Sequence, residues 1–195
     1  EKQRKSKEKE LGSALSKDII ALLRPPDRTP SDSRNDADEL IPGLYLGNSD
    51  AARNSEWQRE KGILEVVNVA DDVSPSSDAS PTAPHVSHFP LSDSTRVDIL
   101  PLLPSIAEAI SRGMDKGPTL VHCSAGASRS ATAATAFLVL HREKSLLEAL
   151  QIVRKHRPIA YPNKSFFRAL IDLETTHRGS TTLPTAALAL HEDDT

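Results

Sequence analysis

The segment from His122 to Ser130 combines a nucleophile, a cation and a run of small residues. Cys123 is the only cysteine in the 195-residue sequence, and Arg129 follows it closely. The residues between them are all small: Ser124, Ala125, Gly126, Ala127 and Ser128. Without bulky side chains, such a loop can curl until successive backbone N–H groups point to one place, which makes an anion-binding site where a helix begins.

The surroundings of Cys123 favour a thiolate that can attack a phosphate ester. The N-terminal end of a helix and the Arg129 guanidinium both stabilise an ionised sulfur. Arg129 also offers a planar fork of donors that binds two phosphoryl oxygens at once, which lysine does less well. Ser130 can donate a hydrogen bond to the sulfur and help it leave in a second step, whereas His122, on the strand side, is expected to orient the loop. A nucleophile, an anion clamp and backbone amides in one loop meet the requirements for phosphoryl transfer.

Such a reaction also needs a proton donor for the leaving oxygen. Asp93 is the best candidate, because it follows an expected strand in a polar loop. Aspartate is also common as a plain turn residue, which is the alternative for this position. Asp98 is the competitor, but its place before a run of helically spaced apolar residues favours a helix cap.

Composition argues against several other functions. The formal net charge is −3, so no bulk attraction to nucleic acid or to a membrane surface is expected. A single cysteine excludes an internal disulfide and multi-cysteine metal sites, and it fits a reducing, intracellular compartment, either cytoplasm or nucleus. No apolar run approaches the about 18 residues of a membrane-spanning helix. We therefore expect no metal, no cofactor, no nucleic-acid partner and no membrane partner, and the sequence indicates no oligomeric state.

Strand and helix patterns alternate along the middle of the chain. Apolar and β-branched runs predict strands at 44–46, 65–70, 88–91 and 119–122. Apolar residues at helical spacing predict helices at about 49–61, 99–110, 128–141, 145–157 and 163–176. Ser145 with Glu148 forms a capping box, and Asn163 is suited to cap the last helix. The alternation predicts an α/β fold, a central and mostly parallel twisted sheet with helices on both faces, with the Cys123 loop at its ligand-binding edge.

Both ends of the chain and one internal stretch break this pattern. Residues 1–38 predict an amphipathic helix that ends at Pro25-Pro26, followed by a flexible linker. Its basic residues and leucines could dock a kinase, but the interspersed acidic residues favour a solvated helix or a loose tail. Residues 71–84 predict an exposed loop, and residues 178–195 a flexible tail. The catalytic domain is therefore expected at 39–177.

These residues resemble the signature of the cysteine-dependent protein phosphatases, and specifically of the dual-specificity phosphatases. The signature itself is His122-Cys-x5-Arg129-Ser130. Other matching segments lie at 41–47 (IPGLYLG), at 136–139 (AFLV) and at 157–166 (RPIAYPNKSF). The resemblance implies that Asp93 is the general acid and that Asn163 supports the phosphate loop. Ser165 departs from the pattern, because the family usually has glycine there.

The resemblance implies a small, atypical member that hydrolyses phosphotyrosine and phosphoserine or phosphothreonine through a cysteinyl-phosphate, without a cofactor. The chain lacks the length and the recognition loop of the classical tyrosine phosphatases, so a shallower pocket is expected. Its partner would be a phosphoprotein, with a MAP kinase as one candidate. Two alternatives stay open at this point: a pseudophosphatase that only binds phosphopeptides, and a phosphatase of a non-protein phosphate ester.

Overall fold

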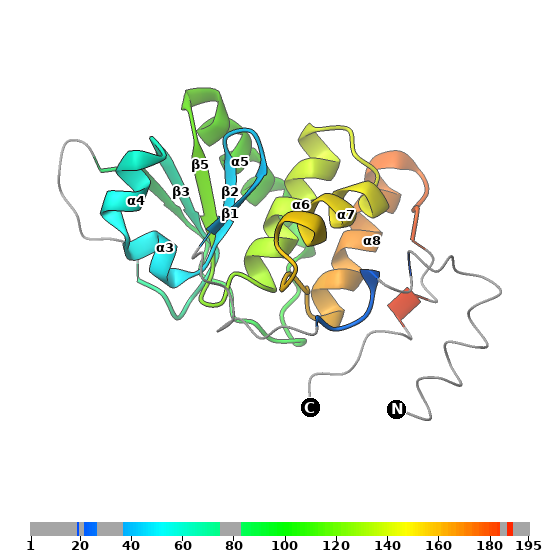
Figure 1. Cartoon of the computed structure of the whole chain (residues 1–195). Coiled ribbons are helices and arrows are strands. Elements are labelled where there is room, and N and C mark those ends of the chain that lie inside the picture. Colours follow the sequence, from blue (N-terminus) through cyan, green and yellow to red (C-terminus); the bar gives the residue numbers. More distant parts are fainter. Residues whose placement is uncertain (1–18, 20–21, 27–36, 75–82, 184–186, 189–195) are drawn as a thin grey trace.

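A five-stranded sheet forms the centre of the molecule (Figure 1). The structure is a computed structural model that describes residues 19, 22–26, 37–74, 83–183 and 187–188. The strand order is β1-β2-β5-β3-β4, with β1 antiparallel to β2 and the other pairs parallel. The strands are β1 (Ala37–Ile41), β2 (Leu44–Gly47), β3 (Glu65–Asn68), β4 (His85–His88) and β5 (Thr119–His122). This confirms the predicted α/β fold with its mostly parallel sheet.

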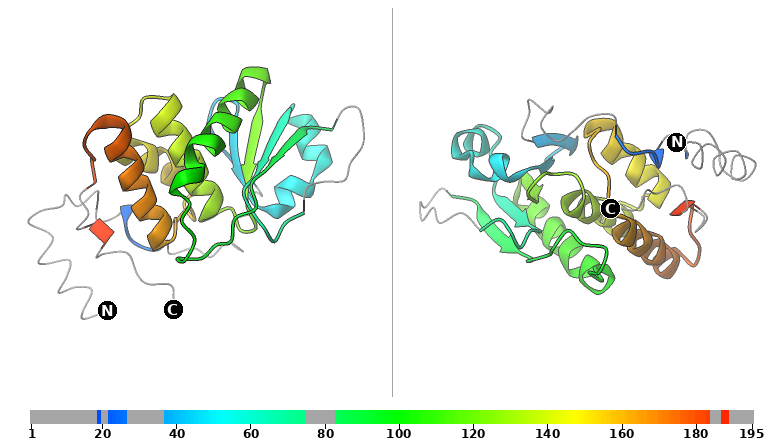
Figure 2. Two further views of the ribbon diagram at one scale, coloured as in Figure 1. Left: turned by 180° about the vertical axis from the view of Figure 1, so that it is seen from behind. Right: turned by 90° about the horizontal axis from the view of Figure 1, so that it is seen from below.

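Helices cover both faces of this sheet (Figures 1 and 2). They are α3 (Ser49–Arg53), α4 (Ser55–Glu60), η2 (Leu100–Leu102), α5 (Leu103–Lys116), α6 (Arg129–His141), α7 (Leu146–His156) and α8 (Lys164–Arg178). The helix α6 is buried along almost its whole length and packs between α5, α7, α8 and the sheet. It therefore fixes the loop that precedes it, which is the Cys123 loop.

Alternation along the strands produces the two layers of core. Val67 and Val121 point to the face covered by α5 and α6, where they join the large apolar cluster. Their neighbours Val66 and Leu120 point to the other face and pack with Ala51 of α3. A period of two is what strands buried on both faces require.

Helix boundaries follow local chemistry. The side chain of Ser145 accepts a hydrogen bond from the Glu148 backbone, and the Glu148 carboxylate accepts one in return, which confirms the predicted capping box. Asn163 caps α8 by accepting from the backbone N–H of Phe166 at 3.0 Å. The other end of α8 stops at Gly179, whose φ of +78° suits glycine.

Several element boundaries differ from the prediction. The helix expected at 49–61 is two helices, because Asn54 interrupts it and caps the second one. The strand expected at 88–91 lies earlier, at His85–His88, and β1 was not predicted at all. Asp98 accepts a hydrogen bond from the backbone N–H of Leu100 at 3.2 Å, but it lies one residue before Ile99, the N-cap of η2.

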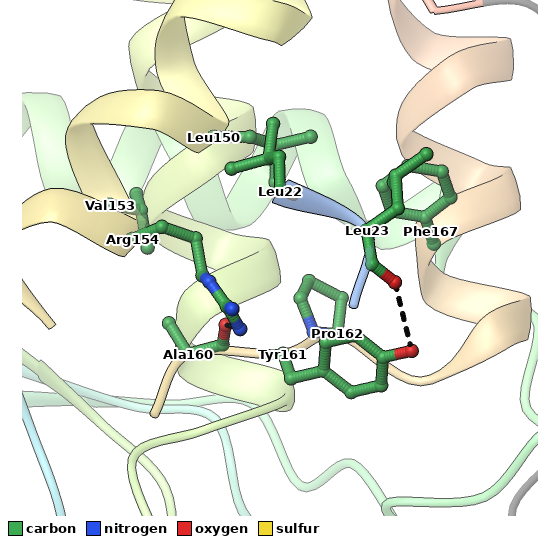
Figure 3. Close-up of a pocket in the computed structure, with 9 residues that line it drawn as sticks. All are labelled: Leu22, Leu23, Leu150, Val153, Arg154, Ala160, Tyr161, Pro162 and Phe167. Carbon is green, nitrogen blue, oxygen red and sulfur yellow. Dashed lines mark hydrogen bonds between the residues drawn. The ribbon is translucent and has the colours of Figure 1, made fainter. Parts of the chain in front are cut away.

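The described parts of both terminal segments pack against the domain. Leu23 is 2% exposed and lies beside α7 and α8, where it forms a small apolar pocket with Leu22, Leu150, Phe167 and others (Figure 3). Most of the predicted N-terminal helix and linker lie outside the described residues. At the other end Leu183, Ala187 and Leu188 are buried in the main core, so the predicted flexible tail is wrong for these residues.

In the part of the chain that the structure describes, no helix has the length and apolar character to cross a membrane.

Candidate active site

The Cys123 loop lies where β5 ends and α6 begins, at the carboxyl edge of the parallel strands. The carbonyl oxygen of His122, the last residue of β5, accepts a hydrogen bond from Val69 N–H at 3.0 Å. From the other side, Ser49 N–H donates to the carbonyl oxygen of Ser124 at 3.1 Å. The loop is thus held by the ends of both neighbouring strands, which is where open α/β sheets place ligands.

The sulfur of Cys123 sits inside this loop. The residue is 1% exposed. Its Sγ lies 3.2 Å from the Oγ of Ser130 and 3.3 Å from the backbone nitrogen of Gly126, whose N–H points at the sulfur. Both groups are placed to donate a hydrogen bond to the sulfur, and α6 starts within a few residues of it.

Arg129, the first residue of α6, is buried and densely hydrogen-bonded. Its Nη1 donates to Asp72 Oδ1 at 2.7 Å and to the Leu91 carbonyl at 2.9 Å. Its Nη2 donates to Ser124 Oγ at 2.8 Å. Burial acts to lower the pKa of Arg129, but the hydrogen bond to Asp72 and the nearby negative charges raise it above its ordinary value. Arg129 is therefore a permanent cation beside Cys123.

The Nε of Arg129 differs from the other nitrogens of this side chain. It is buried and has no hydrogen-bond partner among the described residues. The carboxylate oxygen Asp93 Oδ2 lies 3.7 Å from this Nε. A buried donor without a partner costs free energy, and a phosphoryl oxygen would satisfy it.

Asp93 is held at the same site by two hydrogen bonds. Its Oδ1 accepts from Ser128 Oγ at 2.7 Å and from the Asn163 side-chain amide at 2.9 Å. The backbone N–H of Asn163 in turn donates to Ser128 Oγ at 3.1 Å. Asn163 therefore caps α8 and also joins Ser128 of the Cys123 loop to Asp93.

Arg157, which directly follows α7, supports the loop from below, although no site role was predicted for it. It is fully buried, with its Nε donating to the Gly126 carbonyl at 2.6 Å and its Nη2 to the Ala125 carbonyl at 3.4 Å. Its Nη1 donates to Asp38 Oδ2 at 2.7 Å, which neutralises the buried charge. Arg157 thus holds two loop carbonyls, while the N–H of Gly126 points at Cys123 Sγ. The only sequence signal was its place in the segment at 157–166.

Gly126 is the residue that lets the loop come this close to its supports. Its φ is +68°, a conformation that favours glycine. A Cβ at this position would lie 2.5 Å from Arg157 Nη2 and 2.6 Å from the Gly47 carbonyl oxygen. Glycine at position 126 is therefore needed for the loop to pack against Arg157 and Gly47.

The expectation of an exposed loop at 71–84 is wrong for Val73, whereas Asp71 and Asp72 are exposed but contact residues of the site. Asp72 Oδ2 accepts from Ser124 Oγ at 2.6 Å, and Asp71 Oδ1 accepts from Arg129 Nη1 at 3.2 Å. Val73 is buried in the core. Neither aspartate was predicted as a site residue, because serine, proline and aspartate are typical of solvated loops and no local pattern shows that two of them contact Arg129.

His122 lies under the loop as a neutral side chain. Burial, the largest effect, lowers its pKa to about 4, so the imidazole carries no charge near neutral pH. Its Nδ1 lies 3.4 Å from the Cys123 carbonyl oxygen. Among the described residues, no group of three or more His, Cys, Asp or Glu side chains is placed to bind a metal ion.

Comparisons with known proteins agree with this geometry. Residues 44–176 match the family model described as dual specificity phosphatase, catalytic domain. Dual specificity phosphatase 28 of Mus musculus is 37% identical over 148 residues, which cover 74% of this chain and 88% of that protein. Dual specificity protein phosphatase 26 of Mus musculus is 35% identical over 144 residues, covering 72% and 68%. The crystal structure of human DUSP28 matches with a TM-score of 0.70 at 30% identity, over 75% of this chain and 97% of that one.

Proposed function

Because the chain belongs to the dual specificity phosphatase family, we propose that Cys123 is the nucleophile with which it hydrolyses phosphate esters of proteins. The substrates are phosphotyrosine and phosphoserine or phosphothreonine side chains. The reaction passes through a cysteinyl-phosphate intermediate and needs no cofactor.

In the first step the Cys123 thiolate attacks phosphorus, forming an S–P bond while the bond between phosphorus and the side-chain oxygen breaks. Arg129 binds two of the phosphoryl oxygens through its Nε and Nη2 edge, and the amides of Ser124 to Ser128 bind the developing negative charge. Asp93 gives its proton to the leaving oxygen, so the product departs as a neutral alcohol or phenol.

In the second step water attacks the phosphorus of the cysteinyl-phosphate. Asp93, now ionised, accepts the proton of the water, and inorganic phosphate forms as the S–P bond breaks. The hydroxyl of Ser130, 3.2 Å from the sulfur, donates a hydrogen bond to the departing thiolate and stabilises it. The enzyme thereby returns to its starting state.

One observation carries this proposal above the others. Cys123 Sγ lies within hydrogen-bonding distance of both Ser130 Oγ and Gly126 N–H, in a loop that also contains Arg129. An ordinary buried thiol packs among apolar atoms and has no need of two donors. A thiolate nucleophile does need them.

The direct test is release of phosphate from a small aryl phosphate across about pH 5 to 8. We expect the wild-type chain to turn over and the Cys123→Ser variant to lose activity by several orders of magnitude. A wild type as inactive as the variant, but still able to bind phosphopeptides, would contradict the proposal and support a pseudophosphatase. An active wild type that ignores phosphopeptides would support a non-protein phosphate ester as substrate.

The role of Asp93 has its own test with a matched control. Asp93→Asn is expected to lower kcat about 10²- to 10⁴-fold for a phosphoserine peptide, and less for an aryl phosphate whose leaving group needs little protonation. Asp98→Asn removes a neighbouring exposed aspartate that accepts a hydrogen bond from Leu100 N–H, and it should leave both rates close to wild type. Equal losses for both substrates in Asp93→Asn would argue against a general acid.

Within the class of phosphoproteins, we propose a MAP kinase as the specific partner. We also propose that the protein acts inside the cell, because a thiolate nucleophile must stay reduced. The experiment is dephosphorylation of a purified, phosphorylated MAP kinase, followed separately at phosphothreonine and phosphotyrosine. Loss of neither phosphate, under conditions in which a phosphopeptide is hydrolysed, would contradict this choice of partner.

A further inference from the structure

Asp71 and Asp72 place fixed negative charge at the mouth of the phosphate site. Both carboxylates contact Arg129, yet their side chains are 44% and 56% exposed. They are therefore open to whatever approaches the site from solvent. A phosphorylated segment that reaches Cys123 must pass close to them.

These two residues are positioned by the buried side chain of Asn68. Its Oδ1 accepts from Ala70 N–H at 3.0 Å, and its Nδ2 donates to the Val73 carbonyl at 2.7 Å. Asp71 N–H also donates to the Leu91 carbonyl at 3.2 Å. The turn from Ala70 to Val73 is thus anchored on both sides of the aspartates, so the charge has a defined place.

Asp72 remains ionised in this position. The hydrogen bond from Arg129, followed by that from Ser124, lowers the pKa of Asp72 to about 2. The group therefore carries its charge throughout the neutral pH range. Asp71 and Asp72 together present two negative charges beside a site that must accept a phosphate dianion.

The contacts on Arg129 show that substrate can bind without displacing Asp72. Both aspartates use only Nη1 of the guanidinium, at 3.2 and 2.7 Å. The unpartnered Nε and the second proton of Nη2 remain for a phosphoryl group. Asp72 would therefore stay at the rim during the reaction and act on the residues that flank the phosphorylated side chain.

We propose that Asp72, supported by Asp71, is a specificity-determining residue that favours phosphosites flanked by lysine or arginine over phosphosites flanked by acidic residues. The inference rests on the proposed function, since it assumes that a phosphoprotein segment enters this site. An acidic flank meets like charge at the rim, and a basic flank meets opposite charge. The effect acts on binding and on kcat/KM, and less on the chemical step.

The test uses two phosphotyrosine peptides that differ only in their neighbouring residues, lysine in one and glutamate in the other. For the wild-type chain we expect kcat/KM to favour the lysine peptide by roughly threefold to tenfold for each flanking charge at low salt, and the ratio to shrink at high salt. Asp72→Asn should bring the ratio close to one, mainly by improving the glutamate peptide. A small aryl phosphate without flanking charge normalises each variant for its basal activity.

The control is Asp172→Asn, which removes an exposed aspartate paired with Arg168 on α8. It should leave the ratio at its wild-type value. A wild-type ratio near one, or a ratio that Asp72→Asn does not change, would overturn the inference.

Binding of the same peptides to the Cys123→Ser variant separates this inference from the proposed function. If the wild type releases no phosphate but the variant still prefers the lysine peptide in an Asp72-dependent way, the proposed function fails and the charge selection stands. If turnover is normal but neither assay shows the preference, the charge selection fails and the proposed function stands.

Discussion

Arg157 donates a hydrogen bond of 2.6 Å from its Nε to the carbonyl oxygen of Gly126, in the middle of the phosphate loop. The two residues come from the end of α7 and from the turn after β5, so the bond joins distant parts of the chain. Arg157 also donates from its Nη2 to the Ala125 carbonyl at 3.4 Å, so it holds the two successive peptide groups on either side of Gly126. The peptide group between Ala125 and Gly126 has its carbonyl bonded to Arg157 and its N–H pointing at the sulfur of Cys123.

Replacing Arg157 with lysine tests this support. Lysine keeps the charge but cannot reach two loop carbonyls and Asp38 with one planar fork. We expect kcat/KM to fall about 10- to 100-fold while the chain still folds, because the phosphate loop loses its fixed geometry. The measurement is phosphate release together with a thermal melt.

The matched control for Arg157→Lys is Arg112→Lys on α5. Arg112 is exposed and pairs loosely with Glu108 at 3.9 Å. It should behave as wild type in both assays. An Arg157→Lys enzyme with unchanged kcat/KM would show that the loop keeps its shape without this brace.

Gly126→Ala is expected to abolish activity without unfolding the protein. The added methyl group would lie 2.5 Å from Arg157 Nη2 and 2.6 Å from the Gly47 carbonyl oxygen, so the loop must shift away from its support. Activity should fall more than about 100-fold, because a displacement of 1 Å in a catalytic loop has effects of that order. Phosphate release and circular dichroism would be followed in parallel.

Gly62→Ala is the natural comparison for that variant. Gly62 has nearly the same backbone conformation, φ +65°, but a Cβ there meets nothing within 4 Å. It should lose only about 1 kcal/mol of unfolding free energy and keep full activity. Similar activity in the two alanine variants would mean that the contact with Arg157 and Gly47 is not needed.

Asn163→Ser separates the two roles of Asn163. Serine can still cap α8, but it has no amide to donate to Asp93. We expect the free energy of unfolding to change by less than about 1 kcal/mol and kcat to fall about tenfold, with the larger loss for a phosphoserine peptide. A loss of stability with normal kcat would show that Asn163 serves only the helix.

Glu65, at the edge of the sheet opposite the Cys123 loop, is expected to make the free energy of unfolding depend on pH. The carboxylate is 3% exposed, and its Oε1 lies 2.8 Å from His85 Nδ1 and 2.7 Å from Ser87 Oγ. Burial acts to raise the pKa of Glu65, but hydrogen bonds from His85, Ser87 and Lys116 outweigh it and leave the pKa below its ordinary value. Its contribution is present above the unfolded-state pKa and is lost as pH falls through the lower folded-state value.

Glu65→Gln should therefore lower the free energy of unfolding at neutral pH by about 1 to 3 kcal/mol and flatten its fall in acid. Urea unfolding at several pH values between neutrality and about pH 3 measures both effects. Curves for variant and wild type that run parallel through the acid range would contradict the assignment of this pH dependence to Glu65.

The parts of the molecule that sequence predicted well are those determined by neighbouring residues. The small residues between Cys123 and Arg129, and the capping box at Ser145, act within a few positions of each other. The alternation of strand and helix patterns was enough for the α/β fold. In each case the local residue pattern favours the same conformation that the folded protein adopts.

Other features depend on contacts that local patterns do not contain. The local sequence around Arg157 predicts the polar end of a helix. Only the fold shows that Arg157 is buried against Asp38 from β1. The local sequence around Asp72 predicts a solvated loop. It does not show the contact with Arg129, which lies far along the chain. Leu183 looked like part of a tail because an isolated leucine has no periodic neighbours, although it is fully buried.

The central claim is that Cys123 becomes covalently phosphorylated during turnover. The most direct measurement is a rapid acid quench of the wild-type chain turning over an aryl phosphate, followed by mass spectrometry of the peptide that contains Cys123. Ser130→Ala should increase the trapped fraction, because loss of the hydroxyl 3.2 Å from the sulfur slows the departure of the thiolate. We expect the added mass of one phosphoryl group on Cys123, and none in Cys123→Ser. Full turnover with no phosphate on Cys123 in either the wild type or Ser130→Ala would contradict it.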